Sequence, residues 1–229
     1  MMAAGPTPVA DWLSHPAGLV VALALVSLLP LAFMSITAFV KISTVLQIVR
    51  SAIGAQSVPS STVVMALAAA LTLIAMGPVG ERIAARASAL LSGNPLPDTA
   101  TLVHDGMQAV GGPLHDFLVA NSSSTERARF LDVARRARPE SERSGVHDDD
   151  WTVIVPAFVV TELGEAFALG FLIYLPFLVI DLVVSNVLLA LGMQMMSPTQ
   201  VRLPFKLLLF VAIDGWGLLA RSLVSGYRL

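Results

Sequence analysis

The chain has no cysteine, which excludes disulfide bonds, thiolate metal ligands and cysteine nucleophiles. Its four histidines are scattered, and no two have the His-x-x-x-His spacing of a typical zinc site. It also lacks a Gly-x-Ser-x-Gly nucleophile elbow and a glycine-rich phosphate loop with its lysine. These absences argue against an enzyme, a metal site and a nucleotide cofactor.

Charge is scarce as well. Only 13% of the 229 residues are charged and 55% are hydrophobic, with a mean hydropathy of +0.77. This balance is typical of membrane proteins and lies outside the range of soluble globular domains. The net charge of −2, without a dense basic patch, gives no reason to expect nucleic-acid binding. The first 18 residues contain Asp11 but no lysine or arginine, so they lack the basic region that begins a signal peptide.

The charges that are present divide the chain into three regions. Residues 81–150 hold 19 of the 30 charged residues, and the segments on either side are strongly apolar. We therefore predict an N-terminal hydrophobic helical hairpin in residues 1–80 and a polar, partly helical extramembrane segment in residues 81–150. A C-terminal hydrophobic hairpin with a Met-rich tip follows in residues 151–229. The predicted fold class is an all-α membrane protein with two kinked hairpins.

The first hairpin is predicted from two uncharged blocks. Residues 17–40 are long enough to span a bilayer as a helix, with a kink or break at Pro30. The second block, residues 63–79, begins after the potential N-cap Ser60 and ends at Gly77-Pro78. The positive-inside rule assigns the intervening Lys41–Arg50 connection to the cytoplasm, and therefore the N-terminus and residues 81–150 to the outside.

Within the polar segment, Thr125 to Arg138 has the apolar spacing of an amphipathic helix that Pro139 would end. Gly106 and the Gly111-Gly112-Pro113 run predict an irregular loop upstream. Three acids at residues 148–150 then favour the start of a long apolar helix, because an acid interacts well with a helix N-terminus.

The C-terminal hairpin carries charges inside apolar runs. Its first helix is expected to continue to about Gly192 with a break or kink at Pro176, and its second to run from about Pro204 to Leu223. Asp181, Lys206 and Asp214 lie among Leu, Val, Ile and Phe. Each such charge costs about 2.5–3.5 kcal/mol at the centre of a lone membrane helix. They must pair, face water or lie against partner subunits.

The order of motifs in this hairpin resembles one family, the FliP/SctR export-gate proteins of bacterial flagella and type III secretion systems. A second matching stretch runs from Lys41 to Gln56, and the missing signal peptide favours the virulence-type SctR branch. This chain departs from the family pattern at Gly164, where relatives often have Lys, and at Gln194, where they often have Met. The matching elements are Pro156-Ala157-Phe158, Thr161-Glu162-Leu163, Ala166-Phe167, Gly170-Phe171, Pro176-Phe177-Leu178, residues 180–184, 193–196 and 203–207, and Asp214-Gly215-Trp216.

The resemblance implies a pore-forming core subunit that conducts unfolded substrate proteins across the bacterial inner membrane. It implies a homo-oligomer, expected to be a pentamer, assembled toward the periplasmic side with a small two-helix subunit and a larger multi-span subunit. It assigns a channel gate to Met193, Met195 and Met196, whose soft thioethers could close around an axis. A buried charge network for subunit docking is assigned to Glu162, Asp181 and Lys206.

Simpler interpretations remain open for each of these assignments. The methionines could pack as an ordinary loop tip, and the charges could be neutralised within one chain. The same buried charges would also suit a small-solute or proton-coupled transporter, and a non-conducting membrane scaffold is a further alternative. An intramembrane aspartyl protease using Asp181 and Asp214 is disfavoured, because Asp214 follows Ala212-Ile213 where a Gly-x-Gly-Asp motif is required.

Overall fold

The computed structural model describes residues 16–54, 59–92, 99–193 and 196–228. Throughout these residues the regular structure is helical, which confirms the predicted all-α fold class. The elements are α2 (Pro16–Ile36), α3 (Phe39–Ile53), α4 (Ser61–Ala75), α5 (Gly77–Leu91), α6 (Thr99–Ala120), α7 (Ser124–Arg136), the 3-10 helix η1 (Glu140–Gly145), α8 (Trp151–Ala190), α9 (Pro198–Ala212) and α10 (Gly215–Ser225).

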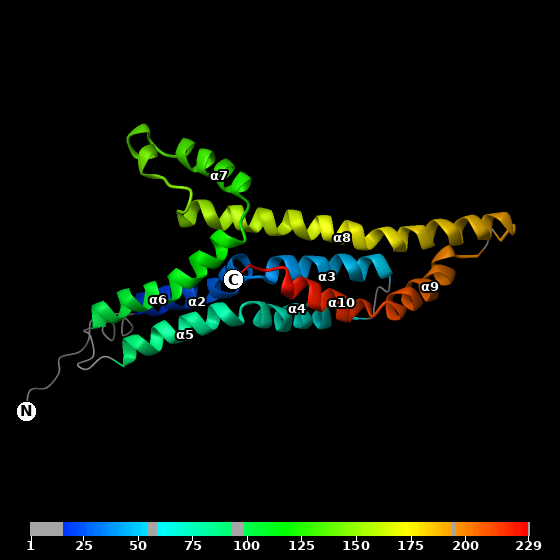
Figure 1. Ribbon diagram of the computed structural model, residues 1–229, viewed down its shortest axis with the longest axis horizontal. Coiled ribbons are helices and arrows are strands. Elements are labelled where there is room, and N and C mark those ends of the chain that lie inside the picture. The colour runs from blue at the N-terminus through cyan, green and yellow to red at the C-terminus, as the bar shows by residue number, and fades with distance from the viewer. Residues whose placement is uncertain (1–15, 55–58, 93–98, 194–195, 229) are drawn as a thin grey trace, which may run out of the picture.

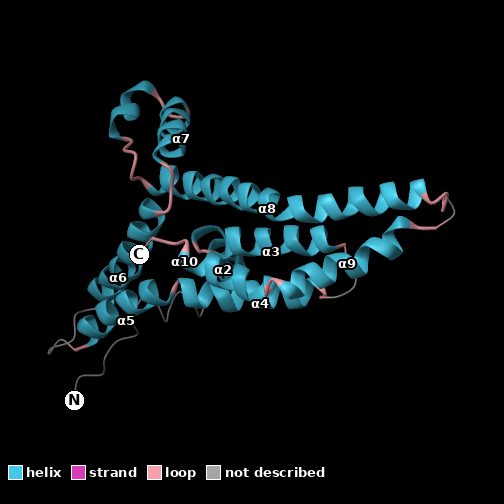
Figure 2. Ribbon diagram, turned by 45° about the vertical axis from the view of Figure 1, so that its right-hand side comes forward, coloured by secondary structure: helices cyan, strands magenta, loops and turns pink. Residues whose placement is uncertain are grey.

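The core is built around α3, which lies between the 40-residue α8 and the shorter α4 (Figures 1 and 2). Ile42, Val45, Leu46 and Val49 are completely buried on α3. Helix α8 runs along most of the molecule, and the hairpin that it forms with α9 extends beyond the end of α3 (Figure 1). The two apolar parts of the sequence therefore pack together into one body.

The prediction that Lys41–Arg50 is a connection between two helices is wrong, because this segment is part of the buried helix α3. Its apolar residues recur at i, i+3, i+4 and i+7 from Ile42, which is the period of an amphipathic helix. The orientation that the positive-inside rule assigns to the chain therefore lacks the short loop on which it depends.

Two of the prolines in apolar runs do not break their helices. Pro30 and Pro176 lie inside α2 and α8, so a break at either proline is wrong. In an apolar helix, neighbouring groups can compensate the hydrogen bond that proline removes. The first block is instead interrupted at residues 37–38, and α9 meets α10 at a 56° bend next to Asp214. Asp214 has a φ of 51°, in the left-handed region that a helix cannot continue through.

Several predicted helix ends are confirmed. The Ser60 hydroxyl accepts a hydrogen bond from the Val63 amide at the start of α4, as an N-cap does. Helix α4 ends at Ala75, and α5 follows at a bend of 55°. Helix α8 begins directly after the three acids, at Trp151. Helix α9, however, begins at Pro198, six residues before the predicted start at Pro204.

The polar segment is more helical than predicted. The amphipathic helix appears as α7, which packs on α8 and ends three residues before Pro139. The irregular loop predicted from Gly106 to Pro113 is wrong, since α6 runs through all of these residues. Packing against the core stabilises α6, because its Phe117 ring lies 5.7 Å from the Phe158 ring. Local helix propensity does not predict such a contact.

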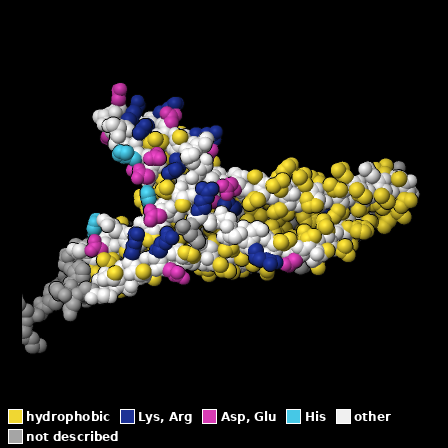
Figure 3. Space-filling view, viewed as in Figure 1, with side chains coloured by type: hydrophobic (Ala, Val, Ile, Leu, Met, Phe, Trp, Pro, Cys, Tyr) yellow, Lys and Arg dark blue, Asp and Glu magenta, His cyan; other side chains and the backbone are white. Residues whose placement is uncertain are grey.

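The α8–α9 hairpin is apolar on its outside as well as its inside. Figure 3 shows hydrophobic side chains covering this hairpin, while charged side chains gather over the opposite end of the molecule. Phe171, Leu182 and Leu208 are all more than 60% exposed. Among the described residues, α8 alone is long and apolar enough to cross a membrane by itself, and up to three spans result if each bent pair counts as one. The outer face of the hairpin therefore needs lipid or protein to cover it.

Candidate functional site

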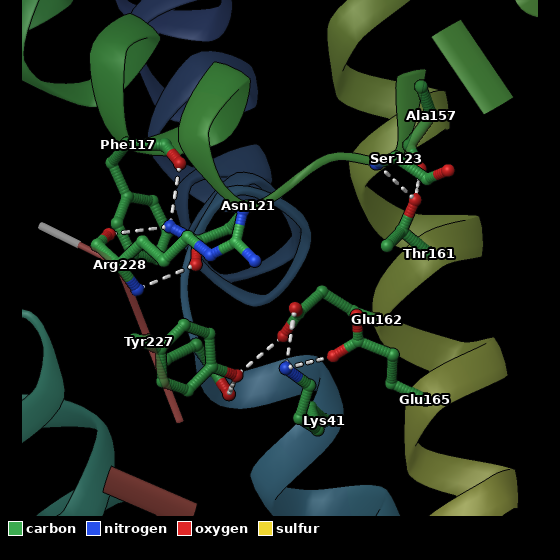
Figure 4. A network of polar contacts seen from close by, with 11 residues as sticks. Lys41, Phe117, Asn121, Ser123, Ala157, Thr161, Glu162, Glu165, Tyr227 and Arg228 are labelled. Carbon is green, nitrogen blue, oxygen red and sulfur yellow. Dashed lines mark hydrogen bonds and ion pairs between the residues drawn. The ribbon is translucent and has the colours of Figure 1, made fainter. Parts of the chain in front are cut away.

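A buried ion-pair cluster joins the start of α3 to the first half of α8 (Figure 4). The Lys41 ammonium lies 2.9 Å from Oε1 of Glu162 and 2.7 Å from Oε2 of Glu165. Glu162 is fully buried and Lys41 is 5% exposed, whereas the Glu165 side chain is half exposed. The Lys41 ammonium and Oε1 of Glu162 are close enough for an ion pair, but they are not aligned for a hydrogen bond. Lys41 thus supplies the positive charge that neutralises the buried Glu162 carboxylate.

Tyr227, which follows α10, completes this cluster. Its hydroxyl donates a hydrogen bond to Oε2 of Glu162 and also lies 3.0 Å from the Ala38 carbonyl. Because the hydroxyl has one proton, it donates to only one of these two oxygens at a time. Burial raises the pKa of the Tyr227 hydroxyl, and the neighbouring Glu162 carboxylate raises it further, so the group stays protonated. The Lys41 ammonium lies 4.5 Å from the centre of the Tyr227 ring.

Neighbouring backbone contacts hold the chain end in place (Figure 4). The Asn121 side chain donates to the Arg228 carbonyl at 2.8 Å and accepts from the Arg228 amide at 3.0 Å. Since Asn121 follows α6, these two bonds tie the polar segment to the C-terminus. The cluster therefore connects α3, α6, α8 and the chain end.

A second cluster lies further along α8. The Lys206 ammonium is 2.8 Å from Oδ2 of Asp181 and donates to the Ala52 carbonyl at 3.0 Å. Lys206 is 4% exposed, so both of these partners are needed to offset its desolvation. Arg202 approaches the other Asp181 oxygen at 3.6 Å. This cluster connects α8 and α9 to the C-terminal end of α3.

The structure therefore divides the predicted network in two. Asp181 and Lys206 form an ion pair, but Glu162 lies 19 residues before Asp181 on the same helix, roughly 28 Å away along its axis. Lys206 is neutralised within its own chain, which is the simpler of the two predicted arrangements.

Sequence reasoning missed Lys41, Glu165, Tyr227 and Arg202 as members of these clusters. For Lys41 a signal was available, because it lies within the amphipathic period of α3. Arg202 lies one turn before Lys206, so both cations fall on one face of a helix that also begins earlier than predicted. Tyr227 gave no signal, since its position depends on the bend between α9 and α10.

The tip of the hairpin carries Met193 and Met196, two of the three residues predicted to form a gate. Helix α8 ends in a Schellman motif: the Met193 amide donates to the Leu188 carbonyl, the Gly192 amide donates to that of Leu189, and Gly192 has a φ of 71°. The side chains of Met193 and Met196 are each about half exposed. Met195 lies outside the described residues.

The two carboxylates of the protease hypothesis belong to separate ion pairs. Asp181 is held by Lys206 and Arg202, whereas Asp214 pairs with Arg221 at 2.9 Å on an exposed surface. Neither carboxylate has the other as a partner with which to share a proton. Among the described residues, no group of three His, Asp or Glu side chains could hold a metal ion.

The small residues of α8 allow close approach of α3. Ala166 and Gly170 are both buried on the face of α8 that packs against α3. A Cβ atom on Gly170 would overlap the Ile48 side chain, at 2.5 Å from its Cδ1 atom. Close packing of this kind holds Lys41 and Glu162 in register on the facing helices.

Comparison with known proteins gives consistent matches over nearly the whole chain. A family model described as the FliP family matches residues 22–223. The chain is 44% identical over 207 residues to the "Probable translocation protein y4yL" of Sinorhizobium fredii, covering 90% of this chain and 91% of that protein. It is 39% identical to the "Yop proteins translocation protein R" of Yersinia pestis, with 91% and 95% covered. Identity to the "Flagellar biosynthetic protein FliP" of Rhizobium meliloti is 37%, with 96% and 85% covered.

Proposed function

The chain belongs to the FliP family, and from this premise we propose that it is the pore-forming core subunit of a type III secretion export gate. The family is one of secretion-apparatus components, so the chain is a membrane-associated export component and not an enzyme. Its higher identity to translocation-type relatives than to the flagellar one supports membership of the virulence-type branch. The transported molecules would be unfolded secretion substrates.

The observation that carries this proposal is the apolar outer face of the α8–α9 hairpin beside its internally paired charges. The hairpin exposes Phe171, Leu182 and Leu208, yet Asp181 and Lys206 are turned inward and paired. When the charges are paired inside the chain and the apolar side chains are exposed, the exposed surface is suited to burial against lipid or neighbouring subunits. We infer that sister copies, expected to number five, cover much of this face.

The Met-rich tip supplies the proposed gate. Met193 and Met196 are already exposed at the end of the hairpin, where several copies could meet around an axis. Methionine side chains are apolar and deformable, so a ring of them would exclude ions and still yield to a passing polypeptide. The Schellman motif fixes the position of this tip relative to α8.

The two charge clusters would act by positioning the surfaces that dock. Lys206 holds α9 against α3 and α8, and Lys41 holds α3 against α8, so each cluster sets the orientation of an apolar face. Partners are expected to include the small two-helix and the larger multi-span gate subunits. The assembly would lie in the bacterial inner membrane, directed toward the periplasm.

The gate can be tested by changing Met193, Met195 and Met196 together to Ala. The shorter side chains would leave a gap at the constriction, and we expect the reconstituted complex to conduct small ions where the unchanged complex does not. The measurement is single-channel conductance in planar bilayers. A matched control is Met107→Ala, since Met107 is 72% exposed on α6, away from the hairpin. Conductance that stays at the wild-type level in the triple variant would contradict the gate.

A further inference from the structure

The hydroxyl of Tyr227 lies between two acceptors that belong to different parts of the fold. One is Oε2 of Glu162 on α8, and the other, at 3.0 Å, is the carbonyl of Ala38 directly before α3. This carbonyl also accepts from the Ile42 amide at 3.3 Å, which leaves a second lone pair for the hydroxyl. Two hydrogen bonds along this row of three oxygens require two protons, and Tyr227 beside an ionised Glu162 supplies one. The row therefore has room for a second proton, on Glu162.

The balance of charge around Glu162 also favours an added proton (Figure 4). The Lys41 ammonium lies between two carboxylates, 2.9 Å from Glu162 and 2.7 Å from Glu165, so one positive charge faces two negative ones. Glu162 is fully buried, and its Oε1 accepts no hydrogen bond from any described residue. Buried charge that is not fully compensated is costly, and two carboxylates that share a site can hold one proton between them. A single proton on the pair makes these three groups neutral.

The other charged groups on the surrounding elements leave this balance unchanged. Arg228 is near Glu162 but exposed, so solvent screens its charge. Helix α2, which packs on α8, has no charged residue. The cations of α9, Arg202 and Lys206, are held at Asp181, and the charged residues of α6 and α7 do not line the cavity around Glu162.

A polar cavity of about 240 Å³ gives water access to the cluster. Because the half-exposed Glu165 and the exposed Arg228 both line it, the cavity opens to solvent. A polar space of this size holds water, which can carry protons to the two acids. Its lining consists of Lys41, Ala120, Asn121, Ser122, Ser123, Thr161, Glu162, Glu165, Gly226 and Arg228.

We propose that Glu162 binds one proton from this cavity when the pH falls, and that the Tyr227 hydroxyl then donates to α3 in place of α8. The added proton on Oε2 of Glu162 is donated to the Tyr227 oxygen. The proton of Tyr227 itself is donated to the Ala38 carbonyl, and Lys41 keeps Glu165 as its counter-charge. Both hydrogen bonds of the row are then made at the same time.

The consequence is a pH-sensitive contact at the chain end. A hydrogen bond to a carboxylate is roughly twice as strong as one between neutral groups, so proton uptake weakens the attachment of Tyr227 to α8. The Asn121 side chain ties the adjacent Arg228 backbone to the polar segment, so the acidity on that side of the molecule acts on this contact. The proposal does not depend on the pore, and its failure would leave the proposed function untouched.

Infrared difference spectroscopy of the full chain in detergent micelles tests the proton site. A protonated carboxyl group absorbs as a carbonyl and a carboxylate does not. On lowering the pH from neutral to mildly acidic, we expect a carbonyl band of a buried acid, with the intensity of one proton per chain. Glu162→Gln should abolish this band. Tyr227→Phe, which keeps Glu162 but removes the oxygen that accepts its proton, should shift it.

Glu142→Gln is the matched control, because Glu142 is exposed on η1 and lies outside the cavity. It should leave the band of the buried acid unchanged. Should Glu162→Gln fail to fold, Tyr227→Phe decides the question, and an unshifted band would contradict the proposal. Two further results would overturn it: equal loss of the band in the Glu162 and Glu142 variants, or a titration that moves when choline replaces potassium at constant ionic strength. The last would indicate that a metal cation, and not a proton, compensates the second carboxylate.

Discussion

Replacement of Lys41 by Met is expected to lower the free energy of unfolding of the subunit by about 3–5 kcal/mol, the cost of breaking a buried ion pair from one side. Met has nearly the length of Lys, so the packing between α3 and α8 is largely retained while the positive charge is lost. Glu162, which is fully buried, then keeps only the Tyr227 hydroxyl as a partner. Unfolding of the purified chain in detergent micelles, followed by circular dichroism, measures the change.

Arg136→Met provides the control for this prediction. Arg136 pairs with Asp132 at 2.8 Å, a distance comparable to those of Lys41, but on the exposed surface of α7. Loss of an exposed pair is expected to cost about 0–1 kcal/mol. Adding Glu162→Gln to the Lys41→Met variant should restore part of the stability, because the unpaired charge is removed. Equal effects of the Lys41 and Arg136 changes would show that the buried cluster does not stabilise the fold.

The second large effect is expected from Lys206→Ala, which should reduce recovery of the assembled complex more than insertion of the single chain into membranes. Lys206 connects Asp181 on α8 and Ala52 on α3, so its loss frees α9 to change its orientation in the hairpin. Insertion depends mainly on overall hydrophobicity, which the change does not lower. Quantitative immunoblots of the membrane fraction and of the affinity-purified complex separate the two outcomes.

Arg221→Ala is a suitable comparison, since it removes a pair of similar length from an exposed position. It should leave both insertion and assembly near the wild-type level. A further variant, Asp181→Asn, tests whether the pair or the lysine alone is required. If Lys206→Ala lowers insertion and assembly by the same factor, the cluster contributes to the fold of the chain but has no separate role in assembly.

Sequence patterns predicted the helical class and many helix ends because these depend on local chemistry. Ser60 caps α4 through its own hydroxyl, and α8 begins directly after the acids at residues 148–150. The glycines of α6 misled the prediction, because their effect on helix propensity is about 1 kcal/mol each and core packing of Phe117 and Leu118 outweighs it. Likewise, an internal proline does not end a helix whose neighbours compensate its missing donor.

The charge clusters were only half predictable for a related reason. Asp181 and Lys206 stand out because they interrupt apolar runs, and a hairpin brings them together. Lys41 and Glu162 are 121 positions apart, so their contact depends on how α3 packs against α8. Tyr227 reaches Glu162 only after the 56° bend between α9 and α10. Contacts of this kind follow from tertiary packing, which no local pattern specifies.

The central claim, that this chain assembles with sister copies around a shared axis, is tested most directly by the mass of the complex extracted from membranes in mild detergent. Native mass spectrometry should give a particle with several copies of the 24.2 kDa chain, expected to be five, together with smaller and larger heterologous membrane subunits. A particle of one or two copies without partners, able to transport a small solute, would contradict the account.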